Sequence, residues 1–433
     1  MSKEYHTVPT VVEDEDESDS GTESLAVDKL DERSPQKKVS NFYAFWNICN
    51  SIQGVAILAM PETVKYGGVF TVLCMTVVAI LSSYTAKILV SCLYTETTSG
   101  KRIRQHKSYA DVGEAFWPGK GRILVLVVQF LELLFMATLY PIICGEVVFM
   151  LSPVVSRKLW ILIFGLAMIP NIFLKSLFHV SWISLFTVVS AFLVFGTVAG
   201  YSFSCALHWQ SEDLLVFQPE KFPIAVGIIV ASYSSQMYLA VLEGDMETPE
   251  RFSTVTNYAY LAMTVMKIGI GVAGYLTFQN LTAEIITNNL PSQLRLAVNV
   301  LIVLLAFSSY SLPMFTVFKM LENADIPYIR PCIPVDNKCS ILSSGLRLSL
   351  VIVTIILAVF VPYFSLLLAF IGSLTGALIE YIFPCVFHLC LKWDSLRWYD
   401  ITFDILIVIF SSVLGVVGLF VTGKDLLVAY GAF

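Results

Sequence analysis

Charged side chains are scarce in this chain of 433 residues: Asp, Glu, Lys and Arg together make up 14%, whereas soluble globular domains contain about 25%. Apolar residues make up 56%, which excludes a disordered chain and, with so few charges, a soluble enzyme. No HExxH, GxSxG or P-loop signature is present, and the five histidines are scattered. We therefore predict a polytopic membrane protein that is not an enzyme and has no metal site and no bound cofactor.

The chain also lacks a basic region of the kind that binds nucleic acid. Its net charge of −6 arises within residues 1–38, which contain 11 acidic and 5 basic residues, while residues 39–433 are electrically balanced. The acidic run at residues 13–19 cannot form a core. We predict a disordered acidic tail at residues 1–38, followed by a transmembrane domain at residues 39–433 that lies in a lipid bilayer.

Eleven apolar stretches follow the tail, each long enough, or nearly so, to cross a hydrocarbon layer of about 30 Å as a helix. They are residues 42–60, 69–93, 123–151, 160–174, 182–207, 222–242, 258–278, 294–318, 346–361, 364–391 and 401–421. The stretches are continuously apolar rather than alternating, which argues against a transmembrane β-barrel. We therefore predict an all-α polytopic membrane protein with eleven transmembrane helices.

Ten of the 22 basic residues outside the tail fall in three loops that lie on one face of the membrane if the eleven spans are correct. These loops are at residues 101–107, 319–347 and 392–397. Because Lys and Arg collect on the cytosolic face, we predict a cytosolic N-terminus and a C-terminus on the opposite, luminal face. Asn280 begins an Asn-Leu-Thr glycosylation sequon, and it falls in a predicted luminal loop.

Polar residues interrupt the first and the sixth predicted spans near their middles. The first span contains Asn50, Ser51, Gln53 and Gly54, and the sixth contains the run Ser-Tyr-Ser-Ser-Gln at residues 232–236. Unsatisfied backbone groups cost several kcal/mol in hydrocarbon, so such segments persist only where they are buried in protein or face a wet cavity. Hydrogen bonding between packed helices is the alternative explanation for each interruption.

The two interruptions lie five spans apart, and both contain Ser-x-Gln. Because five is odd, spans 1–5 and spans 6–10 are inverted copies if they are related. We predict repeat one at about residues 42–207, repeat two at about residues 222–391 and an extra helix at residues 401–421. Interrupted helices at matching places in two inverted halves indicate a transporter binding site at the membrane midplane.

A half-helix N-terminus in such a site can bind a carboxylate, and unwound carbonyls can bind an ammonium group or a cation. Tyr140 and Ser309 lie close to Pro141 and Pro313, and these segments resemble wet helix kinks, with helix packing as the alternative. The predicted substrate-binding residues are Asn50, Ser51, Gln53, Gly54, Tyr140, Ser232, Tyr233, Ser234, Gln236 and Ser309.

Two ionisable residues lie deep within predicted spans. Glu132 is about ten residues into span 3, and Lys267 is nine residues into span 7, a depth of roughly 13 Å. A charge at the bilayer centre costs at least about 2.5–3.5 kcal/mol. We predict that Glu132 couples transport to protons with Lys267 as its charge partner, while a purely structural ion pair is the alternative.

Other ionisable residues in the spans have weaker signals. Glu380 lies in the middle of span 10, without an assigned role. Glu62 and Glu146 lie near the outer ends of spans 1 and 3, where we expect them to be solvated. Lys87 lies near the end of span 2, where its long side chain is expected to reach the interface.

Several motifs in this chain resemble the amino acid/auxin permease superfamily, and within it the branch of vesicular inhibitory amino acid transporters. The motifs are residues 50–54 (Asn-Ser-Ile-Gln-Gly), 222–236, 242–244 (Leu-Glu-Gly), 289–291 (Asn-Leu-Pro) and 372–376 (Gly-Ser-Leu-Thr-Gly). The resemblance extends over roughly residues 40–421. It implies a fold similar to the broken-helix transporters, a 5+5 inverted repeat with broken helices 1 and 6, plus an eleventh helix.

The resemblance further implies a secondary transporter that loads GABA, glycine or β-alanine into synaptic vesicles by exchange with protons. Such a transporter depends on a proton-pumping ATPase, and a role for chloride is debated for the family. Glu132 and Lys267 match the charged residues that the family has in spans 3 and 7. Two positions depart from the family: Met60-Pro61-Glu62 replaces the frequent Leu-Pro-Tyr, and Glu380 replaces an apolar residue.

Two other functions fit the same sequence. A proton-coupled amino acid symporter of the lysosome or plasma membrane would have the same fold but move its substrate in the other direction. An amino-acid sensor would bind the substrate without transporting it, so flux across sealed vesicles distinguishes a sensor from either kind of transporter. A channel is disfavoured because no ring of charges and no filter-like repeat is present.

Overall fold

The computed structural model describes residues 38–96, 102–170, 177–323 and 341–430. The first half of this part of the chain contains α2 (Asn41–Gln53), η1 (Val55–Ala59), α3 (Met60–Ser91), β1 (Tyr94–Glu96), β2 (Arg102–Arg104), α4 (Tyr109–Phe116), α5 (Gly121–Leu151), α6 (Arg157–Ala167) and α7 (Leu177–Ser204). The strands β1 and β2 form one antiparallel hairpin. The predicted acidic tail, apart from Lys38, lies outside the described residues.

The second half is also helical. It contains α8 (Phe222–Ser232), α9 (Gln236–Gly244), α10 (Phe252–Phe278), α11 (Ser292–Ser309), α12 (Ser311–Asn323), α13 (Ile341–Phe360), α14 (Phe364–Ile371), η9 (Gly372–Ile382), α15 (Phe383–Lys392) and α16 (Trp398–Ala429). Short 3₁₀ turns connect them: η3 (Ala206–His208), η4 (Ser211–Leu215), η5 (Pro249–Arg251), η6 (Gln279–Leu281), η7 (Ile286–Asn289) and η10 (Trp393–Ser395).

Seven helical segments of the described residues are long and apolar enough to cross a membrane, and two shorter apolar helices accompany them. The seven are Val55–Ser91, Gly121–Leu151, Phe222–Gly244, Pro249–Leu281, Ser292–Phe318, Phe364–Ser395 and Trp398–Ala429. The predicted all-α membrane fold is confirmed. The eleven predicted spans cannot be matched one to one, because the outer half of span 1 runs into span 2 and because span 4 extends into residues that the structure does not describe.

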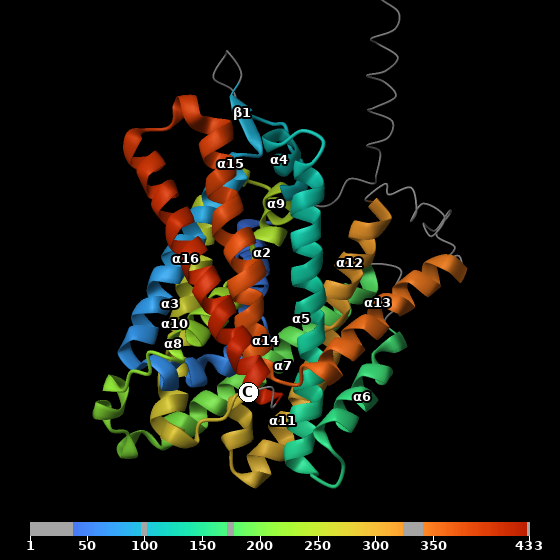
Figure 1. The fold of residues 1–433 in the computed structure, drawn as a ribbon, viewed down its shortest axis with the longest axis vertical. Coiled ribbons are helices and arrows are strands. Elements are labelled where there is room, and N and C mark those ends of the chain that lie inside the picture. Colours follow the sequence, from blue (N-terminus) through green and yellow to red (C-terminus); the bar gives the residue numbers. More distant parts are fainter. Residues whose placement is uncertain (1–37, 97–101, 171–176, 324–340, 431–433) are drawn as a thin grey trace, which may run out of the picture.

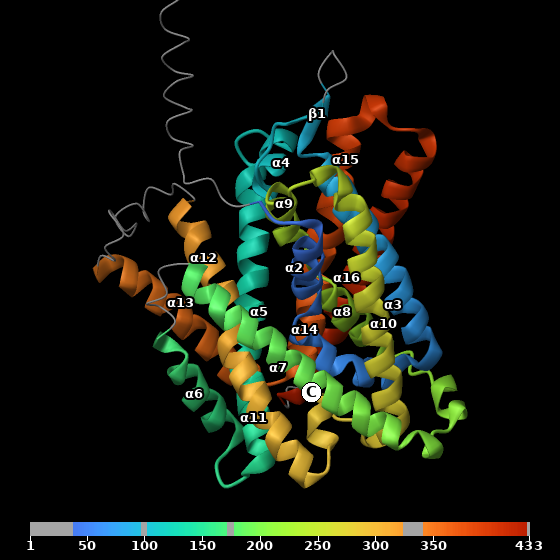
Figure 2. The same cartoon turned by 180° about the vertical axis from the view of Figure 1, so that it is seen from behind.

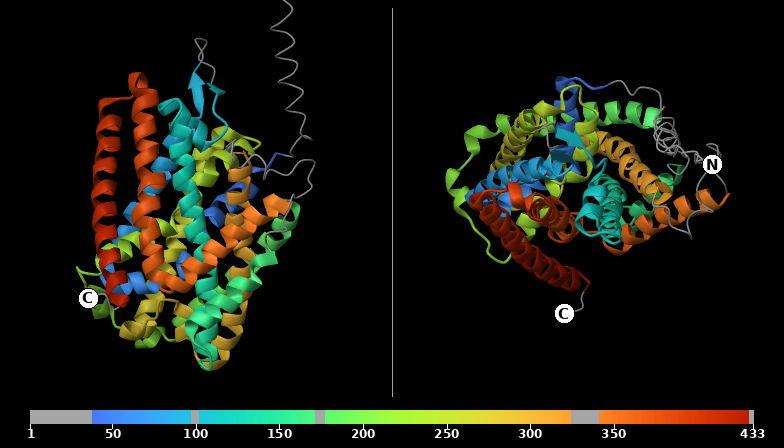
Figure 3. Two further views of the ribbon diagram at one scale, coloured as in Figure 1. Left: turned by 45° about the vertical axis from the view of Figure 1, so that its right-hand side comes forward. Right: turned by 90° about the horizontal axis from the view of Figure 1, so that it is seen from above.

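The interrupted helices occupy the middle of the bundle (Figure 1 and Figure 2). The helix α8 packs against α3, α14, η9 and α16, while α2 packs against α10 and α9. Of the most apolar window in Phe222–Gly244, 83% is buried, against 28% in Trp398–Ala429. The broken sixth span is therefore a core element, and α16 lies at the periphery (Figure 3).

The first span is broken at Gly54, where φ is +47°. A residue with a side chain rarely adopts this conformation, so the helix α2 ends there and the chain continues through η1 into α3. Within α3 the chain changes direction again at Gly68, where φ is +51°. The predicted interruption of span 1 is confirmed.

The sixth span is broken at Tyr233–Ser235, between the end of α8 and the start of α9. The Ser232 hydroxyl donates to the carbonyl of Ile229 at 2.7 Å, in the last turn of α8. Serine side chains compete in this way with regular helical hydrogen bonding, which favours a helix end over its continuation. The predicted interruption of span 6 is also confirmed.

The tenth span contains a wide helical segment, η9, between α14 and α15. Its first residue, Gly372, lies so close to α8 that a Cβ atom there would be 1.9 Å from the carbonyl oxygen of Gly227. The small residues at 372–376 therefore allow close helix approach. Wide helical turns of this kind often occur at functional sites.

The expectation that Glu62 and Glu146 are solvated is wrong for Glu62 and only partly correct for Glu146. Glu62 is 6% exposed and lies under α14. Its carboxyl accepts hydrogen bonds from the hydroxyls of Tyr66, at 2.6 Å, and of Ser365 in α14. Glu146 is partly buried and forms an ion pair with Arg157 at 2.9 Å. Hydrogen-bond and charge partners thus compensate these carboxyls for lost solvation.

Lys87 and Glu284 are two further ionisable residues, near the end of α3 and in the loop after α10. The Lys87 ammonium is exposed, and it donates to the side chain of Asn257 at 3.0 Å. Glu284, in the loop after α10, accepts the backbone N–H of Ser365 at 3.4 Å, and burial raises the pKa of its carboxyl.

The substitution Gly68→Ala tests the reversal within α3. A Cβ atom at this position would lie 2.1 Å from the carbonyl oxygen of Leu214, and a positive φ adds strain of about 1–3 kcal/mol. We expect a lower melting temperature in detergent micelles, measured by the loss of the monodisperse protein peak on heating.

Gly269→Ala is the matched control, because Gly269 lies within α10 with no other atom within 4 Å of a Cβ. Replacing a helical glycine of this kind by alanine is neutral or stabilising by up to about 1 kcal/mol. Equal melting temperatures for the two variants would contradict the strained turn.

Candidate functional site

The ammonium group of Lys267 joins the two helix breaks. This side chain extends from α10, is fully buried, and donates to the carbonyl of Ile52 at 3.1 Å and to the carbonyl of Ser232. Ile52 lies in the last turn of α2, and Ser232 is the last residue of α8. One cation thus binds the C-terminal ends of both broken helices, where helix dipoles favour positive charge.

The same ammonium group lies over the aromatic ring of Tyr233, 3.8 Å from the ring centroid. The hydroxyl of this tyrosine donates to Thr264 at 3.0 Å, and its ring stacks on Tyr260. The ring face attracts the cation electrostatically. Lys267 is therefore held from several sides within the protein core.

Two buried carboxyls contact the residues that follow the break in span 6. The Ser234 hydroxyl donates to one oxygen of Glu132 on α5. One oxygen of Glu380 on η9 accepts the backbone N–H groups of Ser235, at 2.8 Å, and Gln236, at 3.2 Å. The second oxygen of each carboxyl, Oε2, is buried without a hydrogen-bond partner among the described residues. The N-terminal end of α9 therefore has an acidic side chain as its cap.

The remaining polar groups of this break are bonded within the core. The side-chain amide of Gln236 donates to Thr85 at 2.9 Å and to the carbonyl of Ser82 at 3.2 Å. The hydroxyls of Ser235 and Tyr260 are hydrogen bonded at 2.8 Å. These contacts fix the break of span 6 against α3 and α10.

The break in span 1 is more open. A Cβ atom at Gly54 would have no neighbour closer than 4.0 Å, so there is space beside the chain at this point. The Gln53 side chain is half-buried, and its Nε2 donor has no partner among the described residues. A free amide donor next to open space, at a helix break, can bind an anionic group.

The structure brings most of the predicted site residues together. Ser232, Tyr233 and Ser234 contact Lys267 or Glu132 directly, and the Lys267 ammonium bonds next to Gln53 in α2. Ser51 is turned back on its own helix, where its hydroxyl donates to the carbonyl of Ile48 at 2.8 Å.

Other predicted site residues lie apart from this cluster. Asn50 is exposed on α2. Tyr140 lies eight residues, about 12 Å, along α5 from Glu132, and it packs edge-on against Tyr310. Ser309 is half-buried at the end of α11. Asn280 is exposed, so its glycosylation stays a prediction.

In the described part of the chain, the predicted charge partners Glu132 and Lys267 bond to residues of the span-6 break rather than to each other. Among the described residues, Lys267 bonds to carbonyl groups and to the Ser232 hydroxyl, while Glu132 bonds to Ser234. The reason is local: unwound carbonyls at two helix ends lie closer to the ammonium than the carboxyl does. The sequence analysis did not identify Tyr260 as a site residue, and it did not predict that Glu380 binds the start of α9. The position of Glu380 in the middle of a span was the one signal that pointed to a role.

The opposite end of α9 has its own set of partners. The Arg104 guanidinium donates to the carbonyl of Ala240 at 2.6 Å and lies 3.3 Å from the Glu243 carboxyl. Tyr94 donates to the same carboxyl, and burial raises the pKa of this tyrosine to about 12. The helix α9 thus has an anion at its N-terminal end and a cation at its C-terminal end.

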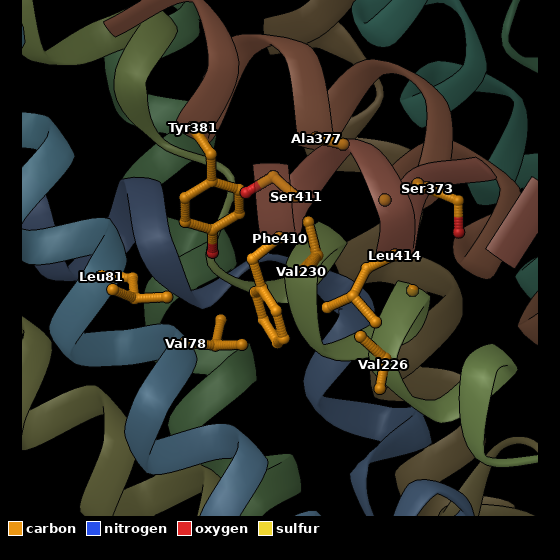
Figure 4. A pocket seen from close by; sticks show the side chains of 13 residues that line it. Val78, Leu81, Val226, Val230, Ser373, Ala377, Tyr381, Phe410, Ser411 and Leu414 are labelled. Carbon is orange, nitrogen blue, oxygen red and sulfur yellow. The ribbon is translucent and has the colours of Figure 1, made fainter. Parts of the chain in front are cut away.

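A separate crevice lies behind the broken helix, between α3, α8, η9 and α16 (Figure 4). Its lining is apolar apart from Ser373, Tyr381 and Ser411, and it contains none of the predicted binding residues. The Tyr381 hydroxyl is bonded to Ser82 at 2.8 Å. The crevice offers no charged group for a zwitterion, so we place the candidate site at the helix breaks.

Comparisons with known proteins agree with this architecture. The family model described as transmembrane amino acid transporter protein matches residues 37–423. The vesicular inhibitory amino acid transporter of Xenopus tropicalis is 35% identical over 393 residues, which cover 88% of this chain and 76% of the relative. The vesicular GABA transporter of Caenorhabditis elegans is 30% identical over 397 residues, covering 90% and 80%.

A solved structure supports the fold independently. The inward-facing conformation of Mhp1 superposes with a TM-score of 0.56 at 13% identity, covering 89% of each chain. At this identity the likeness concerns the fold alone. It agrees with the transporter fold that the family resemblance implied.

The substitution Lys267→Met tests the role of the ammonium group. Methionine has a similar length but no donor, so the carbonyls of Ile52 and Ser232 lose their partner, at a cost of about 1–3 kcal/mol for each buried unsatisfied group. We expect a clearly lower melting temperature of the purified protein. Lys87→Met is the control, because the Lys87 ammonium is exposed and its loss should leave the melting temperature nearly unchanged. Equal effects of the two substitutions would show that the helix ends do not depend on Lys267.

Proposed function

The chain belongs to the family of transmembrane amino acid transporter proteins, and from this premise we propose that it loads small zwitterionic amino acids, such as GABA, glycine or β-alanine, into vesicles in exchange for protons. The observation that supports this most is the convergence of both helix breaks on Lys267. A helix that is interrupted at mid-membrane exposes backbone groups to a ligand, and its inner and outer halves can move separately.

The substrate carboxylate is proposed to bind at the break of span 1. Gln53 offers an amide donor that has no partner in the described part of the chain, and Gly54 lies beside open space. The N–H groups at the start of η1 have the orientation of a helix N-terminus, which favours an anion. A substrate with a bulky side chain would have to displace the buried residues of η1, which favours small amino acids.

The substrate ammonium is proposed to bind near residues 232–236. Hydroxyl groups and unwound carbonyls are concentrated there, and one carboxyl oxygen of Glu132 has no hydrogen-bond partner within the described segments. A buried carboxyl is an expensive charge in the membrane interior, so it either holds a proton or has a cationic partner. Exchange of a proton for a substrate ammonium follows from this alternation.

The energy of one proton is sufficient for loading. A concentration step of about a hundredfold requires about 2.7 kcal/mol. One proton moving down about one pH unit returns about 1.4 kcal/mol. A membrane potential of about 100 mV adds about 2.3 kcal/mol per charge. Exchange of a single proton therefore drives such a gradient.

The proposal includes the membrane context. We place the protein in the membrane of synaptic-type vesicles, with the N-terminus in the cytosol and the C-terminus in the lumen, beside a proton-pumping ATPase. The support is the vesicular naming of both relatives and the distribution of basic residues in the loops. A contribution of chloride is part of the same set of proposals.

Gln53→Leu tests carboxylate binding at span 1. The substitution keeps the side-chain volume but removes the free donor, and a hydrogen bond to a charged group contributes about 1.5–3 kcal/mol. We expect KM for labelled GABA or glycine to rise by roughly tenfold to a hundredfold, measured by initial uptake rates in proteoliposomes. Asn50→Leu, on the exposed face of α2, is the comparison. A wild-type KM in Gln53→Leu rejects this residue as a carboxylate ligand.

Uptake of labelled GABA, glycine and proline into acid-interior proteoliposomes tests the function as a whole. We expect accumulation of GABA and glycine that a proton uncoupler abolishes. Glu132→Gln should remove accumulation while leaving folded protein, because the amide cannot take up a proton. Binding without flux would instead indicate a sensor, and flux driven out of the acid lumen would indicate a symporter.

A further inference from the structure

Glu380 is the charged residue for which neither the span pattern nor the family resemblance provides a role. It is fully buried in η9, the widened helical segment of the tenth span. One of its carboxyl oxygens accepts the backbone N–H groups of Ser235 and Gln236, and the other has no hydrogen-bond partner among the described residues. The carboxyl is thus bound to the first turn of α9 through one oxygen only.

Glu132, on α5, contacts the same segment, residues 234–236, from the other side. Its carboxyl is also fully buried and bonded through one oxygen, and the other oxygen has no partner among the residues that the structure describes. The hydroxyl of Ser234 donates to Glu132 and also interacts with the carboxyl of Glu380. Two buried carboxyls therefore lie on either side of one serine.

The charges of this cluster do not balance if both carboxyls are ionised. Lys267 provides one positive charge, and it interacts with Glu380 at a distance while bonding to helix-end carbonyls. Two neighbouring carboxylates in a medium of low dielectric constant do not both remain ionised, since their repulsion is not screened by water. One proton on the pair makes the cluster neutral.

We propose that Glu132 and Glu380 form one proton-binding site, in which a single proton is shared by the two carboxyls across Ser234. This inference rests on the proposed function and identifies where its proton binds. The substrate ammonium takes the place of that proton: it bonds to the two free carboxyl oxygens, the proton leaves, and the charge at the pair is unchanged. The exchange of one ammonium group for one proton follows.

Glu380 also connects this exchange to the broken helix. Its ionised form is the stronger cap for the N–H groups at the start of α9, because an anion interacts more favourably with a helix N-terminus than a neutral carboxyl does. Release of the proton on substrate binding therefore tightens the contact between η9 and α9, whereas uptake of the proton loosens it.

Tyr238 of α9 is a titratable group that interacts with Glu132. The titratable groups next to Glu380 are already bonded. Those that interact with Glu380 are Lys267 and Tyr260 from α10, Tyr109 from α4 and Tyr381 from η9 itself. The hydroxyl of Tyr260 bonds to Ser235, that of Tyr109 donates to the carbonyl of Ile379, and that of Tyr381 bonds to Ser82. On α15 and α16, which also pack against η9, His388 and Asp404 bond to each other at 2.7 Å. The α8 and α14 segments have no acidic or basic residue.

The experiment compares proton movement with substrate exchange in one preparation. Purified protein is reconstituted in liposomes that contain a pH-sensitive dye, and labelled GABA or glycine is added from outside. Exchange of labelled for unlabelled substrate at equal pH reports binding and the conformational cycle. The change in internal pH on substrate addition reports the coupled proton. Variants are Glu380→Gln, Glu132→Gln and, as a matched buried carboxyl outside the cluster, Glu62→Gln.

We expect Glu380→Gln to bind substrate more weakly, because the ammonium loses one of its two carboxylate ligands. At saturating substrate its remaining exchange should occur without substrate-driven proton movement above the level of protein-free liposomes, as for Glu132→Gln. The glutamine oxygen still accepts the N–H groups of Ser235 and Gln236, so the fold is maintained. Glu62→Gln should move protons as the wild type does. Wild-type proton movement in Glu380→Gln overturns the shared site while leaving Glu132 as the coupling residue.

Two further results separate the possible failures. A wild-type protein without any amino acid exchange rejects the proposed function, and the shared site with it. If Glu380→Gln does not give folded protein, Glu380→Asp replaces it, since this variant keeps a carboxyl but withdraws it from Ser234 by one methylene. A shifted pH midpoint of substrate-driven proton movement in Glu380→Asp supports the pair, and an unchanged midpoint rejects it.

Discussion

The requirement that every backbone polar group be satisfied within hydrocarbon is the constraint on which this structure depends. Two helices end at mid-membrane, and the carbonyls of Ile52 and Ser232 would be unpaired without a donor. One fully buried lysine supplies that donor to both ends. The interruption of two helices is therefore tolerated because a third helix, α10, contributes a cation where the two helix ends meet.

The second half of the broken sixth span illustrates the same principle at both of its ends. Glu380 binds the free N–H groups at the start of α9, and Arg104 binds a free carbonyl near its end. Each charge has the sign that the helix dipole favours. A helix of nine residues is too short to be stable alone, so these contacts determine whether it stays in place or moves.

Buried charge also distinguishes the interior of this bundle from its rim. The eleventh span, α16, is mostly lipid-facing, yet Asp404 is fully buried and bonded to His388 and Tyr84. That cluster is complete, because every charged group has a partner. At the helix breaks the balance is incomplete: two carboxyl oxygens and the Gln53 amide have no partner among the described residues. An incomplete set of polar partners is what a ligand or a proton can complete.

The sequence by itself determined the membrane class, the positions of the two interruptions and the depth of Glu132 and Lys267, because apolar periodicity and turn-forming residues act locally. The tertiary structure alone decided that Lys267 bonds to Ile52, 215 residues away, that Glu62 is buried under α14, and that Glu380 reaches the start of α9. Such pairings depend on which distant segments pack together. A single sequence shows where a polar group needs a partner, and only the packed helices decide which partner it has.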